Sequence, residues 1–188
     1  MENNMSWRER SKEIFQLEIE GLKKVQDNIG DEVNHAVEMI YQCKGKLVIL
    51  GIGKTGIIGH KIAASLASTG TQTIFINAAE AIHGDLGIIQ EHDLVIVISK
   101  SGNTPEIKVL IPFLKQAKNK LVGIVGNLNS FLAQQADYIL DTTVEKEACP
   151  NNLAPTTSTT AQLAMGDALA VCLQTVRQFT DRDFAKYH

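Results

Sequence analysis

The chain has 188 residues, which is enough for one sizeable hydrophobic core and short for two domains. A net charge of -3 gives no electrostatic reason to expect nucleic acid or an anionic membrane as a partner. The sequence contains neither a membrane-length apolar run nor a signal-peptide core near Met1. Cys43, Cys149 and Cys172 lack metal-ligand spacing, so we expect reduced thiols, no metal site and a cytoplasmic location.

Two helices are expected before the first strand. Apolar residues at helical spacing predict one helix from about residue 6 to residue 28, and a second that ends near Cys43. These helices make up an N-terminal part over residues 1–45. The sequence leaves open whether they pack on the sheet or on another subunit.

Strands and helices are then expected to alternate. The apolar, β-branched segments that predict strands are 46–50, 73–77, 94–98, 121–125 and 138–140. Helices are expected to end at Gly70, to run over 105–118, to start at Ser130, and to cover 158–177 and 181–187. This alternation predicts a single α/β domain over 1–188. Its core over 46–188 is a three-layer sandwich, with a mainly parallel five-stranded sheet between helices. Ligands bind such doubly wound sheets at the carboxyl ends of the strands.

The loop after the third expected strand has the composition of an anion site. It gathers small polar side chains and a cation around a glycine: Ser99, Lys100, Ser101, Gly102, Asn103 and Thr104. Pro105 favours the first position of a helix, with Thr104 as its N-cap. Free N–H groups and the positive end of the helix dipole then predict phosphate binding, and Lys100 adds a full charge. An ordinary turn between a strand and a helix is the alternative.

The glycine loop over 51–56 fits neither of the two nucleotide-binding motifs that it resembles. Its Gly-x-Gly-x-x-Gly spacing matches the dinucleotide fingerprint, but the following strand ends in Asn77 rather than in an acid. A nucleoside-triphosphate loop would need a glycine where Val48 stands. A tight turn remains, and it is expected to place Lys54 and Thr55 over the sheet edge, with Lys54 facing a ligand.

Further polar groups follow the other strands. His83 could polarise a sugar hydroxyl, or bond the last carbonyls of a helix. Glu106 falls in a first helical turn, where the dipole stabilises acids, and Glu147 lies in a charged loop that could simply be solvated. The hydroxyl residues over 156–160 could form a second oxyanion cradle or only cap a helix.

Taken together, these loops resemble the SIS (sugar isomerase) family of phosphosugar-binding domains, and most closely its arabinose 5-phosphate isomerases. The stretches that carry the resemblance are 51–56, 67–71, 83–87, 146–150 and 153–160, extended by 165–170 and 179–185. The resemblance covers about residues 13–188. It implies interconversion of ribulose 5-phosphate and arabinose 5-phosphate for Kdo synthesis, and so for lipopolysaccharide or capsule. It also implies no required cofactor and a homotetramer with active sites near subunit interfaces.

The resemblance also implies residue roles. The catalytic residues of the family match Lys54, Glu106, Glu147 and His188. Positions expected to contact the substrate are Gly53, Thr55, Gly70, Thr71, His83, Ser99, Lys100, Ser101, Thr104 and Ser158. An aldose–ketose isomerase needs a base of near-neutral pKa, a group that stabilises the enediolate, and a phosphate anchor. We assign Glu147 as the base, Lys54 to the enediolate or phosphate, His188 to ring opening or proton transfer, and Glu106 to orientation.

Three departures from the family pattern stand out. The family usually continues past His188 with Pro-Gly-Gly and two CBS domains, so the chain is either a single-domain member or trimmed. Asn77 replaces a frequent His, which predicts weaker zinc inhibition, and Lys100 replaces a more usual Asn, which predicts a firmer phosphate grip. The alternatives are another phosphosugar isomerase, such as a 6-phospho-3-hexuloisomerase, and a non-catalytic phosphosugar sensor. The stretches 83–87 and 147–150 disfavour the first, and the lack of a DNA-binding segment disfavours the second.

Overall fold

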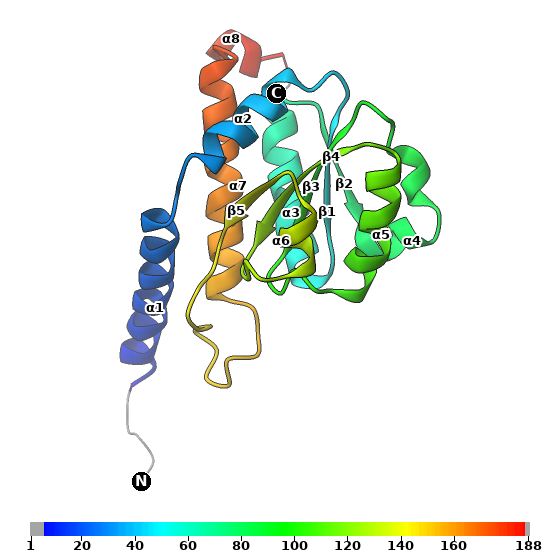
Figure 1. Cartoon of the computed structure of the whole chain (residues 1–188). Helices are drawn as coiled ribbons and strands as arrows, with labels where there is room; N and C mark the ends of the chain where they lie inside the picture. Colours follow the sequence, from blue (N-terminus) through cyan, green and yellow to red (C-terminus); the bar gives the residue numbers. More distant parts are fainter. Residues whose placement is uncertain (1–5, 187–188) are drawn as a thin grey trace.

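The computed structural model describes residues 6–186 and contains one parallel sheet between layers of helices (Figure 1). The strands pair in the order β2-β1-β3-β4-β5, all parallel. Their bounds are Leu47–Gly51 (β1), Thr73–Asn77 (β2), Leu94–Ser99 (β3), Lys120–Val125 (β4) and Tyr138–Asp141 (β5). The expected α/β sandwich, with five parallel strands, is therefore confirmed.

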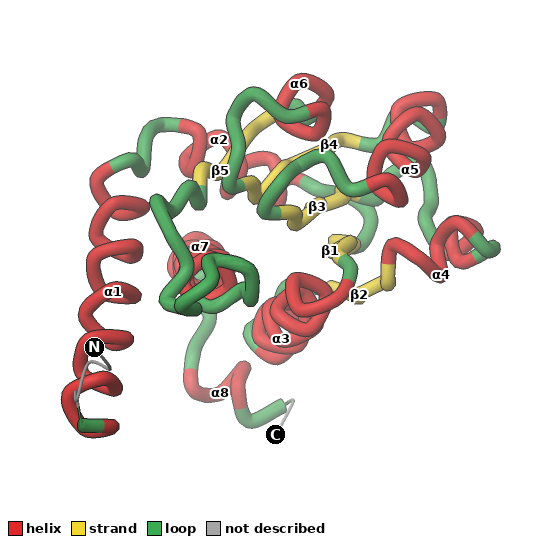
Figure 2. Tube along the Cα trace, turned by 90° about the horizontal axis from the view of Figure 1, so that it is seen from below, coloured by secondary structure: helices red, strands yellow, loops and turns green. Residues whose placement is uncertain are grey.

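Helices cover both faces of this sheet (Figure 2). The longer ones are α1 (Trp7–Asp27), α2 (Glu32–Gln42), α3 (Gly53–Ser68), α5 (Pro105–Gln116) and α7 (Thr157–Val176). The shorter ones are α4 (Ala78–Ile82), α6 (Phe131–Gln135) and α8 (Asp181–Phe184), with a 3-10 turn η1 at Asp85–Ile88. The sequence predicted no helix of defined bounds after β2, although one interpretation placed His83 at a helix end. The segment forms α4, with His83 as its C-cap, and η1, because the Asn77 side chain accepts the N–H of Ala79 at 3.0 Å and starts a helix.

Strand periodicity creates two separate cores. All six residues of β3 are buried, and successive side chains point to opposite faces. Ile96 and Ile98 pack with α2, α3 and α7, whereas Val95 and Val97 pack with α4, α5 and α6. Each fully buried aliphatic side chain stabilises the fold by about 1.5–3 kcal/mol. The apolar run of β3 therefore fixes the sheet from both sides and holds the loop that follows it.

The two N-terminal helices have different partners. Helix α2 buries Ala36 and Ile40 in the sheet core, whereas α1 extends along α7 (Figure 1). A side chain at Gly21 would come within 2.3 Å of the Thr157 side chain, so this glycine lets α1 approach the start of α7. Helix α1 also exposes Trp7, Phe15 and Ile19. Within the described residues, α2 thus packs on the sheet and α1 packs on α7, whereas packing of either helix on another subunit stays a prediction.

The amino edge of the sheet is closed by a buried ion pair. The Asp93 carboxylate accepts the backbone N–H groups of Lys46 at 2.9 Å and Gln90 at 2.8 Å, and it pairs with the Lys46 ammonium. Burial alone would raise the pKa of Asp93, but these donors outweigh it and lower the pKa below its ordinary value. The pair joins the start of β1 to the turn before β3. It therefore lies at the opposite edge of the sheet from the loops that follow the strands.

We predict that Asp93→Asn lowers the free energy of unfolding at pH 7 by about 2–3 kcal/mol, because it leaves the Lys46 ammonium without its buried partner. The folded-state pKa of Asp93 is lowered, so the wild-type advantage is present at neutral pH. It should decline as the pH falls through that pKa. Urea unfolding at several pH values measures this. The control Asp167→Asn removes a half-exposed partner of Lys61 and should cost under about 1 kcal/mol. Equal losses in both variants would contradict the assignment.

Candidate active site

The candidate site lies where the strand order of the sheet reverses. The chain passes from β1 outward to β2 and then returns to the other side of β1 for β3. The loops after β1 and β3 therefore diverge at the carboxyl edge, which is where doubly wound sheets are expected to have a ligand-binding crevice. Lys54 follows β1 and the segment 99–104 follows β3. The structure thus brings together the two loops that the sequence singled out.

The loop after β3 is folded around its own hydroxyl groups. Ser99 is buried at the strand end, and its Oγ accepts the N–H of Gly102 at 3.0 Å. The same Oγ lies 3.0 Å from Thr104 Oγ1. Gly102 has a φ of 61°, and a side chain there would come within 2.0 Å of Ser130 Oγ. Only glycine fits this turn, which keeps the loop backbone close to the crevice.

Two helices begin at this crevice without a side-chain cap. Thr104 occupies the N-cap position of α5, as predicted, but its side chain bonds Ser99 and makes no capping hydrogen bond to the helix. Ile52, the N-cap of α3, has an apolar side chain that cannot cap. The first N–H groups of both helices therefore lack side-chain partners among the described residues. Such helix starts attract anions through free N–H groups and the helix dipole.

A third helix start at the same edge is occupied by the chain's own carboxylate. The Glu147 side chain has no exposed surface, and its Oε2 accepts the N–H groups of Thr156 at 2.8 Å and Ser158 at 3.1 Å. Its Oε1 accepts the hydroxyl of Ser158 at 2.5 Å. The hydroxyl-rich segment 156–160 is therefore an oxyanion cradle, as one of the two interpretations predicted. The oxyanion that it binds is the Glu147 carboxylate of the same chain. The solvated-loop interpretation of Glu147 is wrong.

Lys100 also donates a hydrogen bond to the Glu147 carboxylate. Its Nζ lies 2.6 Å from Glu147 Oε1, and its side chain is 45% exposed. Burial alone would raise the pKa of Glu147, but the Lys100 and Ser158 hydrogen bonds and the two backbone N–H donors lower it to about 2. Glu147 is therefore ionised at neutral pH. With these donors in place, its pKa is not the near-neutral value that a base was expected to need.

The other predicted catalytic residues lie at the carboxyl edge of the sheet or outside the described residues. Lys54 is exposed in the first turn of α3, and Glu106 is half-buried in the first turn of α5. His83 is exposed at the end of α4. His188 lies outside the described residues. Thr55 Oγ1 lies 3.2 Å from Gln162 Oε1 and so joins α3 to α7.

Gly70 and Thr71 are not at this crevice, so a single chain does not bring them together with the other predicted substrate contacts. They follow the C-terminal end of α3 and precede β2, at the amino edge of the sheet. Thr71 is buried and its Oγ1 lies 3.2 Å from Arg177 Nε. A side chain at Gly70 would come within 2.9 Å of the Phe179 ring. These residues help pack the segment after α7 in the described part of the chain.

Sequence reasoning missed three features that shape the site. Gln162 is buried one turn after Ser158, a spacing that places both side chains on one face of α7. Ser130 caps α6 and contacts the turn at Gly102. The Lys100–Glu147 pair is the third omission, although both residues follow strands whose carboxyl ends share one edge. Within residues 6–186 no three His, Cys, Asp or Glu side chains are grouped to hold a metal.

Comparisons with known proteins agree with this geometry. A model of the SIS domain family matches residues 39–172. Over all 188 residues the chain is 47% identical to the arabinose 5-phosphate isomerase KdsD of Yersinia pestis and spans 57% of that protein. Over 157 residues, 84% of the chain, it is 50% identical to the arabinose 5-phosphate isomerase KpsF of Escherichia coli O6:H1 and spans 48% of it.

The chain thus spans about half the length of the curated relatives that it matches. A solved structure of similar extent is a protein of Escherichia coli CFT073 in complex with arabinose 5-phosphate. It superposes with a TM-score of 0.94 at 39% identity, over 99% of both chains.

We predict that Glu147→Gln destabilises the protein at neutral pH by about 2–3 kcal/mol, because it removes a charged acceptor from a buried cradle. The carboxyl has a pKa of about 2 when folded and an ordinary value of 4.5. The wild-type advantage should therefore be complete above about pH 4.5 and vanish as the pH falls toward 2. Urea midpoints across this range measure it, with the exposed Glu145→Gln as control. Curves that stay parallel down to pH 3 would contradict the role of the charge.

Proposed function

Because the chain belongs to the SIS domain family, we propose that it is an aldose–ketose isomerase that interconverts ribulose 5-phosphate and arabinose 5-phosphate. One observation carries the proposal: two uncapped helix starts lie at the same edge of the sheet as Lys54 and a buried, ionised carboxylate. The arrangement supplies an anion site and a separate charged group that could move a proton. The names of the curated relatives and the sugar-phosphate complex of the similar structure support the same substrate class.

The phosphate of the sugar is anchored at the starts of α3 and α5. The backbone N–H groups there are free of side-chain caps, and Ser101 is exposed in the loop between β3 and α5. A phosphate dianion would gain from both helix dipoles at once. Binding energy from this group, remote from the reacting carbons, can hold the C1–C2 end of the sugar in place.

The reaction itself is a proton transfer between neighbouring carbons. A base removes a proton from C1 of ribulose 5-phosphate, and the C2 carbonyl oxygen becomes an enediolate oxygen. A proton then passes from O1 to O2, so that O1 becomes the aldehyde oxygen and O2 a hydroxyl, and the proton taken from C1 returns to C2. We assign the transfer to Glu147 and stabilisation of the enediolate oxygen to Lys54. Glu106 orients these groups, and His188 assists ring opening. No metal ion takes part in this scheme.

The product would be consumed in Kdo synthesis for lipopolysaccharide or capsule, and the enzyme would act in the cytoplasm. Cys43, Cys149 and Cys172 are all free thiols, which suits a reducing compartment. Within residues 6–186, none of the helices combines the length and apolar character that a membrane crossing requires.

The direct test is a carbon-13 NMR time course with ribulose 5-phosphate and a chelator. Arabinose 5-phosphate signals are expected with the unmodified chain. Lys54→Met should lower kcat/KM by about 10²–10³-fold, because it removes the cation from the developing enediolate. The matched control is Lys61→Met, which removes the same charge from the exposed side of α3, where Lys61 pairs with Asp167. Full turnover in Lys54→Met, or no conversion by the unmodified chain, would overturn the proposal.

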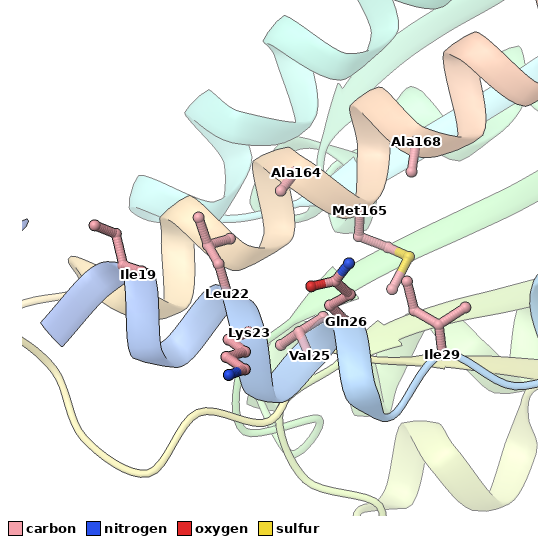
Figure 3. Close-up of a pocket in the computed structure, with 9 residues that line it drawn as sticks. All are labelled: Ile19, Leu22, Lys23, Val25, Gln26, Ile29, Ala164, Met165 and Ala168. Carbon is pink, nitrogen blue, oxygen red and sulfur yellow. The ribbon is translucent and has the colours of Figure 1, made fainter. Parts of the chain in front are cut away.

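Assembly into a homotetramer is part of the proposal, with α1 at a contact between copies. A groove of about 480 Å³ runs between α1 and α7 (Figure 3). It is lined mainly by apolar side chains: Ile19, Leu22, Lys23, Val25, Gln26, Ile29, Ala164, Met165 and Ala168. Ile19 is 54% exposed and Phe15, one turn earlier, is 72% exposed. This helix thus offers both an apolar groove and protruding apolar residues, so a second copy of the chain is the occupant that suits both.

We predict that Ile19→Glu breaks this contact, because it places a charge in the apolar groove. Light scattering after size-exclusion chromatography should give about four times the 20.5 kDa chain mass for the unmodified protein and a smaller particle for the variant. Ser11→Glu adds the same charge to α1 outside the groove and should keep the larger mass. A chain-mass particle for the unmodified protein would contradict the assembly.

A further inference from the structure

The Lys100 side chain reaches across the carboxyl ends of three neighbouring strands. Lys100 follows β3, Gly126 follows β4, and Glu147 lies in the loop after β5. The Gly126 N–H donates to the Lys100 carbonyl at 3.0 Å. A side chain at Gly126 would come within 3.0 Å of that carbonyl and 3.3 Å of Lys100 Cγ. The missing side chain at Gly126 therefore leaves a path for the lysine stem toward Glu147.

The Glu147 carboxylate is fully occupied by donors in this state. Oε1 receives Lys100 Nζ and Ser158 Oγ, and Oε2 receives the Thr156 and Ser158 N–H groups with Thr156 Oγ1 at 3.2 Å. A carboxylate has about four lone-pair sites. No site is left for a proton from a substrate carbon. Glu147 can act only after one donor leaves.

Lys100 is the donor that can leave. The others belong to the start of α7, where Ser158 is buried and Thr156 is half-buried, and they are fixed by the helix. The Lys100 side chain is instead 45% exposed and belongs to the loop that borders the crevice. A phosphate at the starts of α3 and α5 would offer its ammonium a dianion in place of a carboxylate. We propose that Lys100 is a positioning residue that keeps Glu147 occupied until a bound phosphate draws its ammonium away.

This inference rests on the proposed role of Glu147 and adds a control on it. Departure of the ammonium frees one lone pair on Oε1, which is the atom that would take the proton from the substrate. The buried carboxylate, having lost its cation, would also become a stronger base. Unliganded enzyme would hold an inert carboxylate, and the substrate's own phosphate would prepare the site for the proton transfer at its other end.

Few other charged groups surround Glu147 in the described part of the chain. In its own loop, Glu145 is paired with Lys24 of α1, and Lys146 is exposed. The start of α7 contributes hydroxyl and backbone donors, and Glu18 of α1 is held by the Thr160 hydroxyl at 3.1 Å. Lys100, in the loop after β3, is the charged residue whose side chain contacts the Glu147 carboxylate. A change in the Glu147 pKa can therefore be assigned to Lys100 with a suitable control.

The first experiment follows the Glu147 carboxyl carbon by NMR as the pH is lowered, with the signal assigned from Glu147→Gln. In ligand-free wild-type protein the carboxyl should titrate at about pH 2. In Lys100→Met its pKa should rise by about 1–3 units, because the buried carboxylate loses its cation. Lys146→Met removes a nearby charge that does not contact the carboxylate, and should shift this pKa by less than about 0.5 unit. Equal shifts in both variants would overturn the proposal.

The second experiment uses inorganic phosphate and observes the hydrogen bond directly. NMR coupling across the bond between Lys100 Nζ and the Glu147 carboxyl carbon should be present in free protein and lost on saturation with phosphate. Persistence of the coupling with phosphate bound, or failure of phosphate to bind, would contradict the proposal. Neither readout depends on turnover. If the chain fails to convert ribulose 5-phosphate while both results hold, the proposed reaction is wrong and the response of Lys100 to phosphate stands.

Discussion

The site depends on one interaction, the contact of the buried Glu147 carboxylate with the start of α7. A parallel sheet brings the starts of several helices to one edge, and each start carries free N–H groups and a partial positive charge. At α7 those groups are satisfied from within the chain by Glu147. At α3 and α5 the side-chain caps are missing. The same physical feature is therefore used in two ways, to fix a charged residue of the protein and to leave room for a charged ligand.

The two edges of the sheet carry different kinds of polar contact. At the amino edge, Asp93 with Lys46 and Thr71 with Arg177 are paired within the fold, at the opposite end of the strands from the crevice. At the carboxyl edge, Lys54 is exposed and Lys100 is half-exposed. The polar pairs at the amino edge are thus satisfied by other parts of the same fold. The groups that could rearrange lie at the other end, where a ligand can reach them.

Local sequence signals were sufficient for most of the fold. The β-branched runs of β1 and β3 and the apolar spacing of α1, α5 and α7 each specify their element without help from distant residues. Helix α4 was missed because five residues are too few to show a helical period, and because Asn77 starts it through a side-chain contact. Thr104 was correctly placed at the N-cap of α5, but the sequence did not show that the buried Ser99 hydroxyl engages its side chain.

The site was only partly predictable because its central contact is long-range. Lys100 and Glu147 are 47 positions apart and meet only because β3, β4 and β5 are consecutive in the sheet. Strand order cannot be read from either residue. Sequence motifs drew attention to both side chains but not to their pairing, which helps to lower the pKa of Glu147. Gly70 and Thr71 show the converse: they stand in a motif-bearing stretch and serve packing at the opposite edge of the described chain.

The measurement that tests the account most directly is a crystal structure of the unmodified protein with arabinose 5-phosphate bound. The account predicts that the phosphate lies at the starts of α3 and α5 and is bonded to backbone N–H groups in the first turns of these two helices. It predicts that Glu147 remains on α7 and that Lys100 Nζ has moved from its 2.6 Å contact with Glu147 toward the phosphate. A phosphate that displaces Glu147 from the start of α7, or that binds elsewhere while the ion pair stays intact, would contradict it.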